Sequence, residues 1–401
     1  MTDTNASSLP IGDNRDGPRV AILGAGMIAE VHRRSALLAG ARVVGVMASS
    51  AARSADVAAR WRTAPIDSFA ALRELAPDVV HVCSPNGLHA EHTIAALDAG
   101  AHVICEKPLA VSSSVAHELT DYAAQLDRIA TVPFVYRYHP LVREIRARAQ
   151  NGEFGRWQLL HGSYLQDWLL SPMATSWRVD ASKGGPSRTF ADIGSHWCDL
   201  MEFVTGERIA SLIAATTITV PQRPVQSSAT FGGAGGAGGA GPLQRVDTED
   251  AASVMFRTAS GVLGTVTVSQ VSAGRKNRLW FEFDGALRSA VFDQEHPETV
   301  WLGSQGSAEI LPRDPSAGST DARRLSHLPA GHAQGYAQCF ENFVADTYAR
   351  VAGEAVEGVP TFADGLRSSR VVDAVIRSAS SGQWVDVVDV GDVGDVAAAT
   401  H

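Results

Sequence analysis

The sequence predicts two unlike domains: an α/β domain built on a parallel, doubly wound sheet, and an α+β domain with an antiparallel sheet. The first prediction rests on apolar runs that alternate with helical stretches between residues 18 and 140. The second rests on segments between residues 141 and 395 in which apolar and polar residues alternate with period two. With 401 residues, of which 45% are hydrophobic, the chain can form both cores.

The first domain opens with the apolar run RVAILG, which begins at Arg19, and a helix is expected from Met27 to Ala39. Three further buried strands are expected at ARVVGVMA, DVVHVCS and AHVICE, separated by helical stretches. The segment IATVPFVY, residues 129–136, predicts one more strand. Strands of this kind, each followed by a helix, indicate a sheet that is covered on both faces.

Beyond Pro140 the pattern changes to one helix, LVREIRARAQNGEFG, followed by the alternating segments WQLLHGSYLQDW, SVMFRTASGVLGTVTVSQ and RLWFEFDGALRSAVF. A helix is expected around residues 193–205, and two more helices are expected near the C-terminal end. The Gly/Ala-rich run at 231–241 opens no helix and carries no Lys-Ser/Thr pair, so it predicts a flexible surface loop.

Composition excludes several classes of function. The net charge of −9 leaves no basic stripe for nucleic acid, and no apolar run approaches the ~18 residues that span a bilayer. Residues 1–17 lack the features of a secretory signal, so we expect a disordered tail on a cytoplasmic protein. The four cysteines and 13 histidines show no metal-ligand spacing, which predicts reduced thiols and no metal.

The segment GAGMIA follows the first strand and opens the first helix, which is the context of a dinucleotide fingerprint. Gly24 suits the tight turn, Gly26 lets the backbone approach a pyrophosphate, and Met27 and Ile28 begin the helix whose N-terminus would hold it. An ordinary strand-to-helix turn could carry the same letters. We therefore expect a dinucleotide site here, to be weighed with the rest of the chain.

The second strand ends at Met47-Ala48-Ser49-Ser50, with Arg53 one turn later. This position usually carries the acid that binds the ribose 2′-hydroxyl of NAD, and its absence removes repulsion against the 2′-phosphate of NADP. Ser49, Ser50 and Arg53 could contact that phosphate, although the serines could equally be a helix N-cap. The expected coenzyme is NAD or NADP, with NADP preferred.

Two later strands end at the same edge of the sheet. CSPNGLHAEH follows one of them, and there Ser84, Pro85, Asn86 and His89 are expected beside the coenzyme, with Asn86 capping the next helix. VICEKPLA follows the other, and its Glu106 and Lys107 are expected to project into the cleft from the end of the strand, where the chain has left the core. An exposed strand end with routine charges would be the alternative.

In GGPSRTFADIGSHWCDL, Asp192 and His196 stand four residues apart at the start of a helix. That spacing puts a carboxylate and an imidazole on one face, where the carboxylate could orient a catalytic base. A capping aspartate with an unrelated surface histidine would explain the same letters.

Together, GAGMIA, SPN, EKP and DIGSHWCD resemble the Gfo/Idh/MocA family of NAD(P)-dependent oxidoreductases, from about Arg19 to Val390. The resemblance implies a Rossmann domain followed by an open, mostly antiparallel sheet that forms a homo-oligomer, a dimer or tetramer. It implies that Lys107, Asp192 and His196 are catalytic and that Glu106 contacts the nicotinamide ribose.

A narrower likeness, in YLQDW and SWR, is to the levoglucosan dehydrogenase-like sugar and glycoside dehydrogenases of that family. Gln166 and Trp168 share a strand face by period-two geometry and would offer a pyranose a hydrogen-bonding group beside an aromatic platform. Tyr136 and Arg178 are expected near the nicotinamide end. A core-facing aromatic pair is the alternative for this segment.

We therefore expect an enzyme that oxidises a secondary ring hydroxyl of a sugar or glycoside, at C3 by the narrower likeness. Either His196, oriented by Asp192, or Lys107 would take the hydroxyl proton. One alternative is a glycosidase of the same fold that uses NAD for transient oxidation and elimination. Another is a non-catalytic regulator that senses nucleotides.

Overall fold

The structure is a computed structural model that describes residues 17–225 and 242–388. The expected disordered tail, apart from Gly17, and the expected loop at 231–241 lie outside the described residues, as do the last residues of the second domain. No helix in the described part of the chain is long and apolar enough to cross a membrane.

The first domain contains a six-stranded parallel sheet in the order β3-β2-β1-β4-β5-β6. Its strands are β1 Arg19–Leu23, β2 Arg42–Met47, β3 Ala64–Pro65, β4 Val79–Val82, β5 His102–Cys105 and β6 Ala130–Thr131. The helices of this part are α1 Met27–Leu38, α2 Ala51–Trp61, α3 Phe69–Leu75, α4 His89–Asp98 and α5 Ser113–Gln125. The strand order changes direction between β1 and β4, where sheets of this type bind ligands. The predicted doubly wound sheet is confirmed.

The last strand of this sheet is shorter than the sequence predicted. Only Ala130 and Thr131 of the segment 129–136 pair with β5. Pro133 has no backbone N–H to continue the ladder. The chain instead enters a 3-10 turn, η2 Val135–Tyr138, and then the helix α6 Pro140–Gln150. This turn carries Tyr136 to the junction with the second sheet.

The second domain contains a nine-stranded sheet in the order β16-β15-β14-β13-β7-β12-β11-β8-β17. Among its described pairs only β7 and β12 run parallel, so the predicted mostly antiparallel sheet is confirmed. Its strands are β7 Trp157–Leu165, β8 Ile209–Thr217, β11 Ala251–Thr258, β12 Leu263–Ser269, β13 Arg278–Gly285, β14 Ser289–Asp293, β15 Thr299–Gly303, β16 Ala308–Pro312 and β17 Val385–Asp386. A separate two-stranded antiparallel sheet consists of β9 Gln222–Pro224 and β10 Leu243–Arg245.

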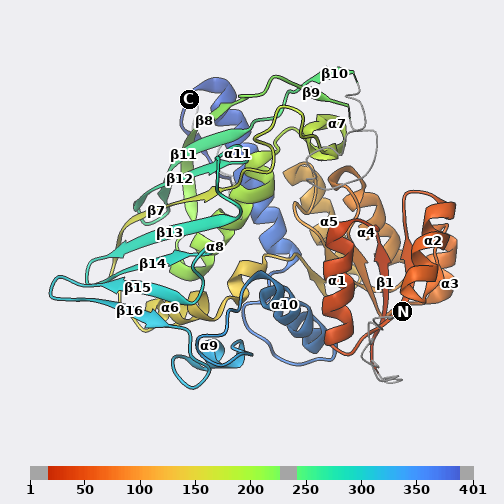
Figure 1. Cartoon of the computed structure of the whole chain (residues 1–401), viewed down its shortest axis with the longest axis horizontal. Helices are drawn as coiled ribbons and strands as arrows, with labels where there is room; N and C mark the ends of the chain where they lie inside the picture. The colour runs from red at the N-terminus through yellow and green to blue at the C-terminus, as the bar shows by residue number, and fades with distance from the viewer. Residues whose placement is uncertain (1–16, 226–241, 389–401) are drawn as a thin grey trace, which may run out of the picture.

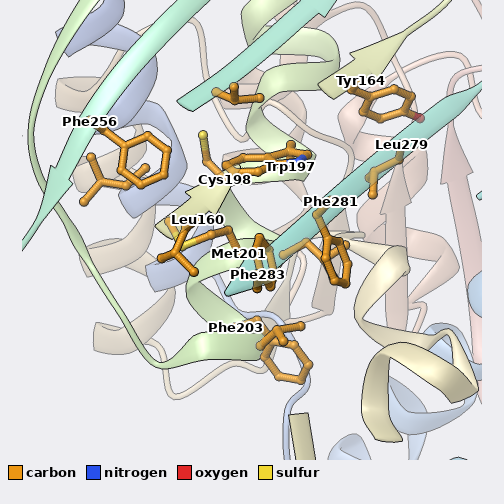
Figure 2. Packing of buried hydrophobic residues seen from close by; sticks show 14 of the residues in the cluster. Leu160, Tyr164, Trp197, Cys198, Met201, Phe203, Phe256, Leu279, Phe281 and Phe283 are labelled. Atoms are coloured by element: carbon orange, nitrogen blue, oxygen red, sulfur yellow. The ribbon is translucent and has the colours of Figure 1, made fainter. Parts of the chain in front are cut away.

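Helices cover one face of this sheet. α8 Ser195–Thr205 and α11 Phe362–Ser381 pack against it, and Trp197 of α8 lies among strand residues in the core (Figure 2). Gly162 of β7 makes this packing possible, because a Cβ there would lie 2.4 Å from Trp197 Nε1. The indole N–H instead donates to Trp280 O at 2.9 Å. The helix that carries His196 is therefore held firmly on the sheet.

The two late helices connect the domains. α10 Tyr336–Val351 lies beside α1 of the first domain, whereas α11 lies between α5 and β8 (Figure 1). The short helix α9 Thr320–Arg324 packs against α6. Sequence spacing left open which domain each late helix covers, and the structure shows that the chain returns from the second sheet to complete the cover of the first.

Candidate functional site

A cavity of about 570 Å³ opens at the carboxyl edge of the parallel sheet, between the two domains. It brings together residues that follow β1, β4 and β5, the last residue of β2, and residues from η2 and the start of α8, as expected for a ligand site at the edge of a doubly wound sheet. The predicted site residues on its wall are Gly24, Gly26, Met27, Ile28, Ser49, Arg53, Ser84, Pro85, Asn86, His89, Glu106, Lys107, Tyr136, Gln166, Trp168, Arg178, Asp192 and His196.

Ser50 is the one predicted residue that does not line the cavity. It is the N-cap of α2, and its hydroxyl accepts a hydrogen bond from Arg53 N at 3.3 Å. The N-cap alternative considered for the serines is thus correct for Ser50. Ser49 and Arg53 remain on the wall, both exposed.

The glycine turn after β1 suits a dinucleotide. Gly24 has φ 124° and packs against the end of β4, where a Cβ would meet Cys83 O at 2.4 Å. A Cβ on Gly26 would meet nothing within 4 Å, so the backbone at the N-terminus of α1 faces open space. A pyrophosphate could approach the helix N-terminus here, as the fingerprint requires.

The loop after β4 is arranged differently from the prediction. Asn86 begins the 3-10 turn η1 Asn86–Leu88 and makes no cap hydrogen bond with its side chain. Its amide instead donates to Gly184 O at 2.9 Å, so it links this loop to the second domain. His89 is buried, with one ring nitrogen 2.8 Å from Pro108 O and the other 2.9 Å from Ser84 O. It therefore ties the loop after β4 to the loop after β5.

Three buried polar atoms of residues on the cavity wall lack a hydrogen-bond partner within the described part of the protein. They are Ser84 Oγ, His92 Nδ1 and His196 Nδ1. Buried polar groups are normally paired, so unpaired ones beside a cavity indicate a ligand or water that completes them. Together with the open backbone at Gly26, they show that the cavity fits a polar coenzyme and substrate.

Glu106 lies on the cavity wall at the end of β5, but the chain has not left the core there, contrary to the prediction. Its backbone N–H still donates to Val82 O of β4 at 2.9 Å, and the residue is only 7% exposed. Burial would raise the pKa of this carboxyl, but the hydrogen bond from His32 and the nearby charges lower it overall. The charge is tolerated because it is bonded inside the protein.

Lys107 joins the two domains at the floor of the cavity. Its Nζ donates to Asp192 Oδ1 at 2.6 Å and to Asp192 O at 2.9 Å. Arg178 lies further away, with Nε 3.6 Å from Asp192 Oδ1. Burial would raise the pKa of Asp192, but the charges of Lys107 and Arg178 hold it well below its usual range. Asp192 is therefore an ionised carboxylate.

A π-helical turn, η4 Phe190–Gly194, presents Asp192 before α8 begins. Glu249 accepts hydrogen bonds from the backbone N–H groups of Arg188 and Phe190, which fixes the start of this turn. Gln270 Nε2 donates to Asp192 Oδ2 at 2.8 Å. Both oxygens of the carboxylate are thus held, and π turns occur often at functional sites.

His196 stands beside Lys107 but is not oriented by Asp192 as expected. No hydrogen bond joins the two side chains in the described structure, because Asp192 is occupied by Lys107 and Gln270. The imidazole instead packs edge-on against Tyr136, with ring centroids 5.1 Å apart. Burial, and after it the charge of Lys107, lowers the pKa of His196 to about 3. It is a neutral imidazole at neutral pH.

A row of polar aromatic and amide groups forms the wall opposite Lys107. The hydroxyl of Tyr136 lies 2.6 Å from that of Tyr164, which donates to Asn277 Oδ1 at 2.7 Å. Gln166 Nε2 donates to the same Asn277 oxygen at 2.8 Å, and Gln166 Oε1 accepts from Trp168 Nε1 at 2.9 Å. Tyr164 is buried, whereas Gln166 and Trp168 are half-buried on the cavity wall.

Several residues of this site were not found from the sequence. Gln270 and Glu249 hold the Asp192 turn, and Asn277 and Tyr336 complete the cavity wall. Gln270 directly follows an alternating strand, but its position depends on the parallel pairing of β12 with β7. No local pattern in the sequence carries that pairing.

One group of potential metal ligands lies outside the cavity. His161 Nε2 is 3.7 Å from Asp284 Oδ2 and 3.9 Å from Glu282 Oε2, on adjacent strands β7 and β13. All three side chains are partly exposed, and exposed acidic groups are common at protein surfaces without a bound ion. The absence of a metal site stays a prediction.

Comparisons with known proteins agree with this architecture. Residues 18–134 match the oxidoreductase family with an NAD-binding Rossmann fold, and residues 142–291 match the GFO/IDH/MocA C-terminal domain. Levoglucosan dehydrogenase of Pseudarthrobacter phenanthrenivorans is 33% identical over 77% of this chain and 80% of its own length. D-glucoside 3-dehydrogenase of Escherichia coli is 34% identical over 47% of this chain and 54% of its own length.

A solved structure of levoglucosan dehydrogenase in complex with NADH and L-sorbose is similar throughout. It superposes with a TM-score of 0.83 at 26% identity and covers 93% of this chain and 100% of that one. Since both domains match and a relative above 30% identity spans most of the chain, the motif-based resemblance is confirmed. The chain belongs to the Gfo/Idh/MocA family of NAD(P)-dependent oxidoreductases that act on CH–OH groups.

Proposed function

We propose that this enzyme oxidises a secondary ring hydroxyl of a sugar or glycoside, with transfer of hydride to NAD(P). The observation that carries the proposal is the placement of a neutral His196 beside the Lys107–Asp192 ion pair, on the wall of the coenzyme cavity. Bound coenzyme would accept the hydride from the carbinol carbon. The protein must bind the hydroxyl oxygen and remove its proton.

The geometry supports a division of roles between His196 and Lys107. Lys107 directs two hydrogen bonds to Asp192, so one of its three N–H groups remains for the substrate oxygen. A neutral imidazole has one nitrogen without hydrogen, which can accept the hydroxyl proton. We therefore assign His196 as the base, Lys107 as the donor that polarises the substrate oxygen, and Asp192 as the residue that positions Lys107.

A neutral pyranose suits the wall opposite Lys107. Trp168 offers an aromatic face, and Gln166 and Asn277 offer amide groups within the same hydrogen-bonded row. One matching relative is named levoglucosan dehydrogenase, and two others are named D-glucoside 3-dehydrogenase and glucose-6-phosphate 3-dehydrogenase, which favours oxidation at C3. These names describe the relatives, and C3 is our proposal for this chain.

For the coenzyme we propose that NADP is accepted at least as well as NAD. No carboxylate follows β2, and Ser49 and Arg53 lie on the cavity wall at that point. An arginine paired with a 2′-phosphate would form a strong, charge-assisted contact. A homo-oligomer, dimer or tetramer, and a cytoplasmic location also remain predictions for this chain, and light scattering would measure the oligomeric state.

A panel of pyranosides assayed with NAD and NADP tests the proposed function. Absorbance of the reduced coenzyme should rise in proportion to the ketone formed. Release of the aglycone without net reduced coenzyme would instead support the glycosidase alternative. Binding of coenzyme without turnover of any sugar would contradict the proposal.

Lys107→Ala should lower kcat by about two or more powers of ten, the scale of losing a positioned acid-base group. Coenzyme should still bind, which fluorescence titration with NADH would measure. Lys183→Ala is the matched control, because Lys183 is an exposed lysine paired with Asp180 away from the cavity wall. Near-normal turnover in Lys107→Ala would exclude Lys107 from catalysis.

Ser49→Asp should shift coenzyme preference towards NAD, because a carboxylate on the cavity wall repels a 2′-phosphate. The ratio of kcat/KM for NADP to that for NAD measures this preference. Ser50→Asp is the control and should shift the ratio less, since residue 50 caps α2 and does not line the cavity. A wild-type enzyme that strongly prefers NAD would show that Arg53 does not bind a phosphate.

Gln166→Leu should lower kcat/KM by an amount equivalent to about 1–3 kcal/mol of transition-state stabilisation, because sugar hydroxyls would be left unpaired in a closed site. It should also change the ranking of deoxy analogues of the substrate. Gln294→Leu removes a partly buried amide that contacts Tyr136 but does not line the cavity, so it controls for stability. If Gln166→Leu lowers the melting temperature and leaves the ranking unchanged, Gln166 is structural.

A further inference from the structure

A row of buried polar side chains runs from Glu106 into the first domain. His32 Nε2 of α1 lies 3.0 Å from Glu106 Oε1, and His32 Nδ1 lies 2.9 Å from Nδ1 of His81 in β4. The hydroxyl of Tyr348 in α10 lies 2.8 Å from His81 Nε2. Both histidines are 0% exposed, and the edge of His32 packs against the ring of Phe340. Polar groups this deeply buried are costly unless every one is bonded.

The row has one consistent arrangement when both rings are neutral. Tyr348 donates its O–H to His81 Nε2, His81 Nδ1–H donates to His32 Nδ1, and His32 Nε2–H donates to Glu106. The contact between the two Nδ1 atoms has room for a single hydrogen, so each bond fixes the next. Burial lowers the pKa of His81 well below its usual value, which agrees with a neutral ring.

The row ends on a carboxylate that is bonded on both oxygens. Oε1 of Glu106 accepts from His32, and Oε2 accepts from the backbone N–H of Lys107 at 3.1 Å. The other titratable groups near this carboxylate are Cys83 after β4, His89 of α4, His196 of α8, Tyr336 of α10, and Cys105 and Lys107 of its own segment. Lys107 is already paired with Asp192. Glu106 thus presents a negative charge to the cavity without an ion pair of its own to a lysine or arginine among the described residues.

We propose that His32, His81 and Tyr348 are positioning residues that keep Glu106 ionised and in one orientation, so that the site favours the oxidised, cationic form of the nicotinamide coenzyme over the reduced form. The inference rests on the proposed dehydrogenase function. Hydride transfer needs contact, so the accepting ring has to lie within reach of Lys107 and His196, which places it near Glu106. The oxidised ring carries a positive charge that the reduced ring lacks, and only that charge is attracted to Glu106.

Coenzyme binding without substrate tests the inference. The dissociation constant of NADH is measured by fluorescence, and that of NAD⁺ by competition, or those of NADPH and NADP⁺ if the wild type binds these more tightly. The variants are Glu106→Gln, His32→Leu, His32→Gln and Tyr348→Phe. Thr347→Val is the matched control, because it removes a buried hydroxyl of α10 next to Tyr348. Among the described residues this hydroxyl forms a hydrogen bond with Thr131 and with no residue of the row. Melting temperatures are recorded for all.

The quantity compared is the ratio of the dissociation constant of the reduced coenzyme to that of the oxidised coenzyme. We expect it to fall about tenfold in Glu106→Gln, since one charge close to a cation is lost. His32→Leu should lower it about threefold to tenfold, because an unbonded buried carboxyl takes up a proton. Tyr348→Phe should lower it about twofold to threefold. His32→Gln should restore part of the loss, since its amide N–H can stand where Nε2 stood, and Thr347→Val should leave the ratio unchanged.

Two results would overturn this inference and leave the proposed dehydrogenase function intact. An unchanged ratio in Glu106→Gln would show that the carboxylate does not act through its charge. The second result is a shifted ratio in Glu106→Gln together with wild-type ratios in His32→Leu and Tyr348→Phe. If those two variants lowered only the melting temperature, the row would be purely structural. Failure of the wild type to bind any of these coenzymes is distinguishable from both, because it would overturn the proposed function on which the inference rests.

Discussion

The ion pair between Lys107 and Asp192 is the contact on which the rest of the site depends. Lys107 follows β5 of the parallel sheet, Asp192 precedes α8 on the antiparallel sheet, and the 2.6 Å bond closes the cavity where the domains meet. Removing one partner from such a poorly exposed pair would leave the other charge uncompensated. The parallel sheet therefore has to hold Lys107 rigidly, and the antiparallel sheet has to hold Asp192 rigidly.

The two sides meet the requirement by different means. On the antiparallel sheet, Gly162 admits Trp197, which locks α8 against β7, while Glu249 and Gln270 fix the π turn and its carboxylate. On the parallel sheet, the hydrogen bonds between β5 and β4 continue to the backbone N–H of Glu106. Its carboxylate is supported by buried histidines rather than by a salt bridge to lysine or arginine. The result is a cluster of charges in which His196 stays neutral beside a lysine, as its proposed role as a base requires.

Much of the fold and part of the site could be predicted because they depend on local pattern. Strand ends of a parallel sheet meet at one edge, so GAGMIA, SPN and EKP could be placed together without knowing any long-range contact. The partners of those residues could not be predicted. Asn86 was expected to cap a helix and binds the second domain, Glu106 was expected where the strand has left the core and is buried, and Asp192 was expected to orient His196 and instead holds Lys107. Each of these contacts crosses between segments distant in sequence, which periodicity does not encode.

A double-mutant cycle on Lys107 and Asp192 tests the central claim most directly. Single variants Lys107→Ala and Asp192→Ala and the double variant would be compared by kcat/KM, with coenzyme affinity measured in each. If the pair acts as one unit, the double variant loses about as much activity as the worse single variant, because the second change removes an interaction that is already broken. Losses that multiply in the double variant would show that the two residues act independently and would contradict the account.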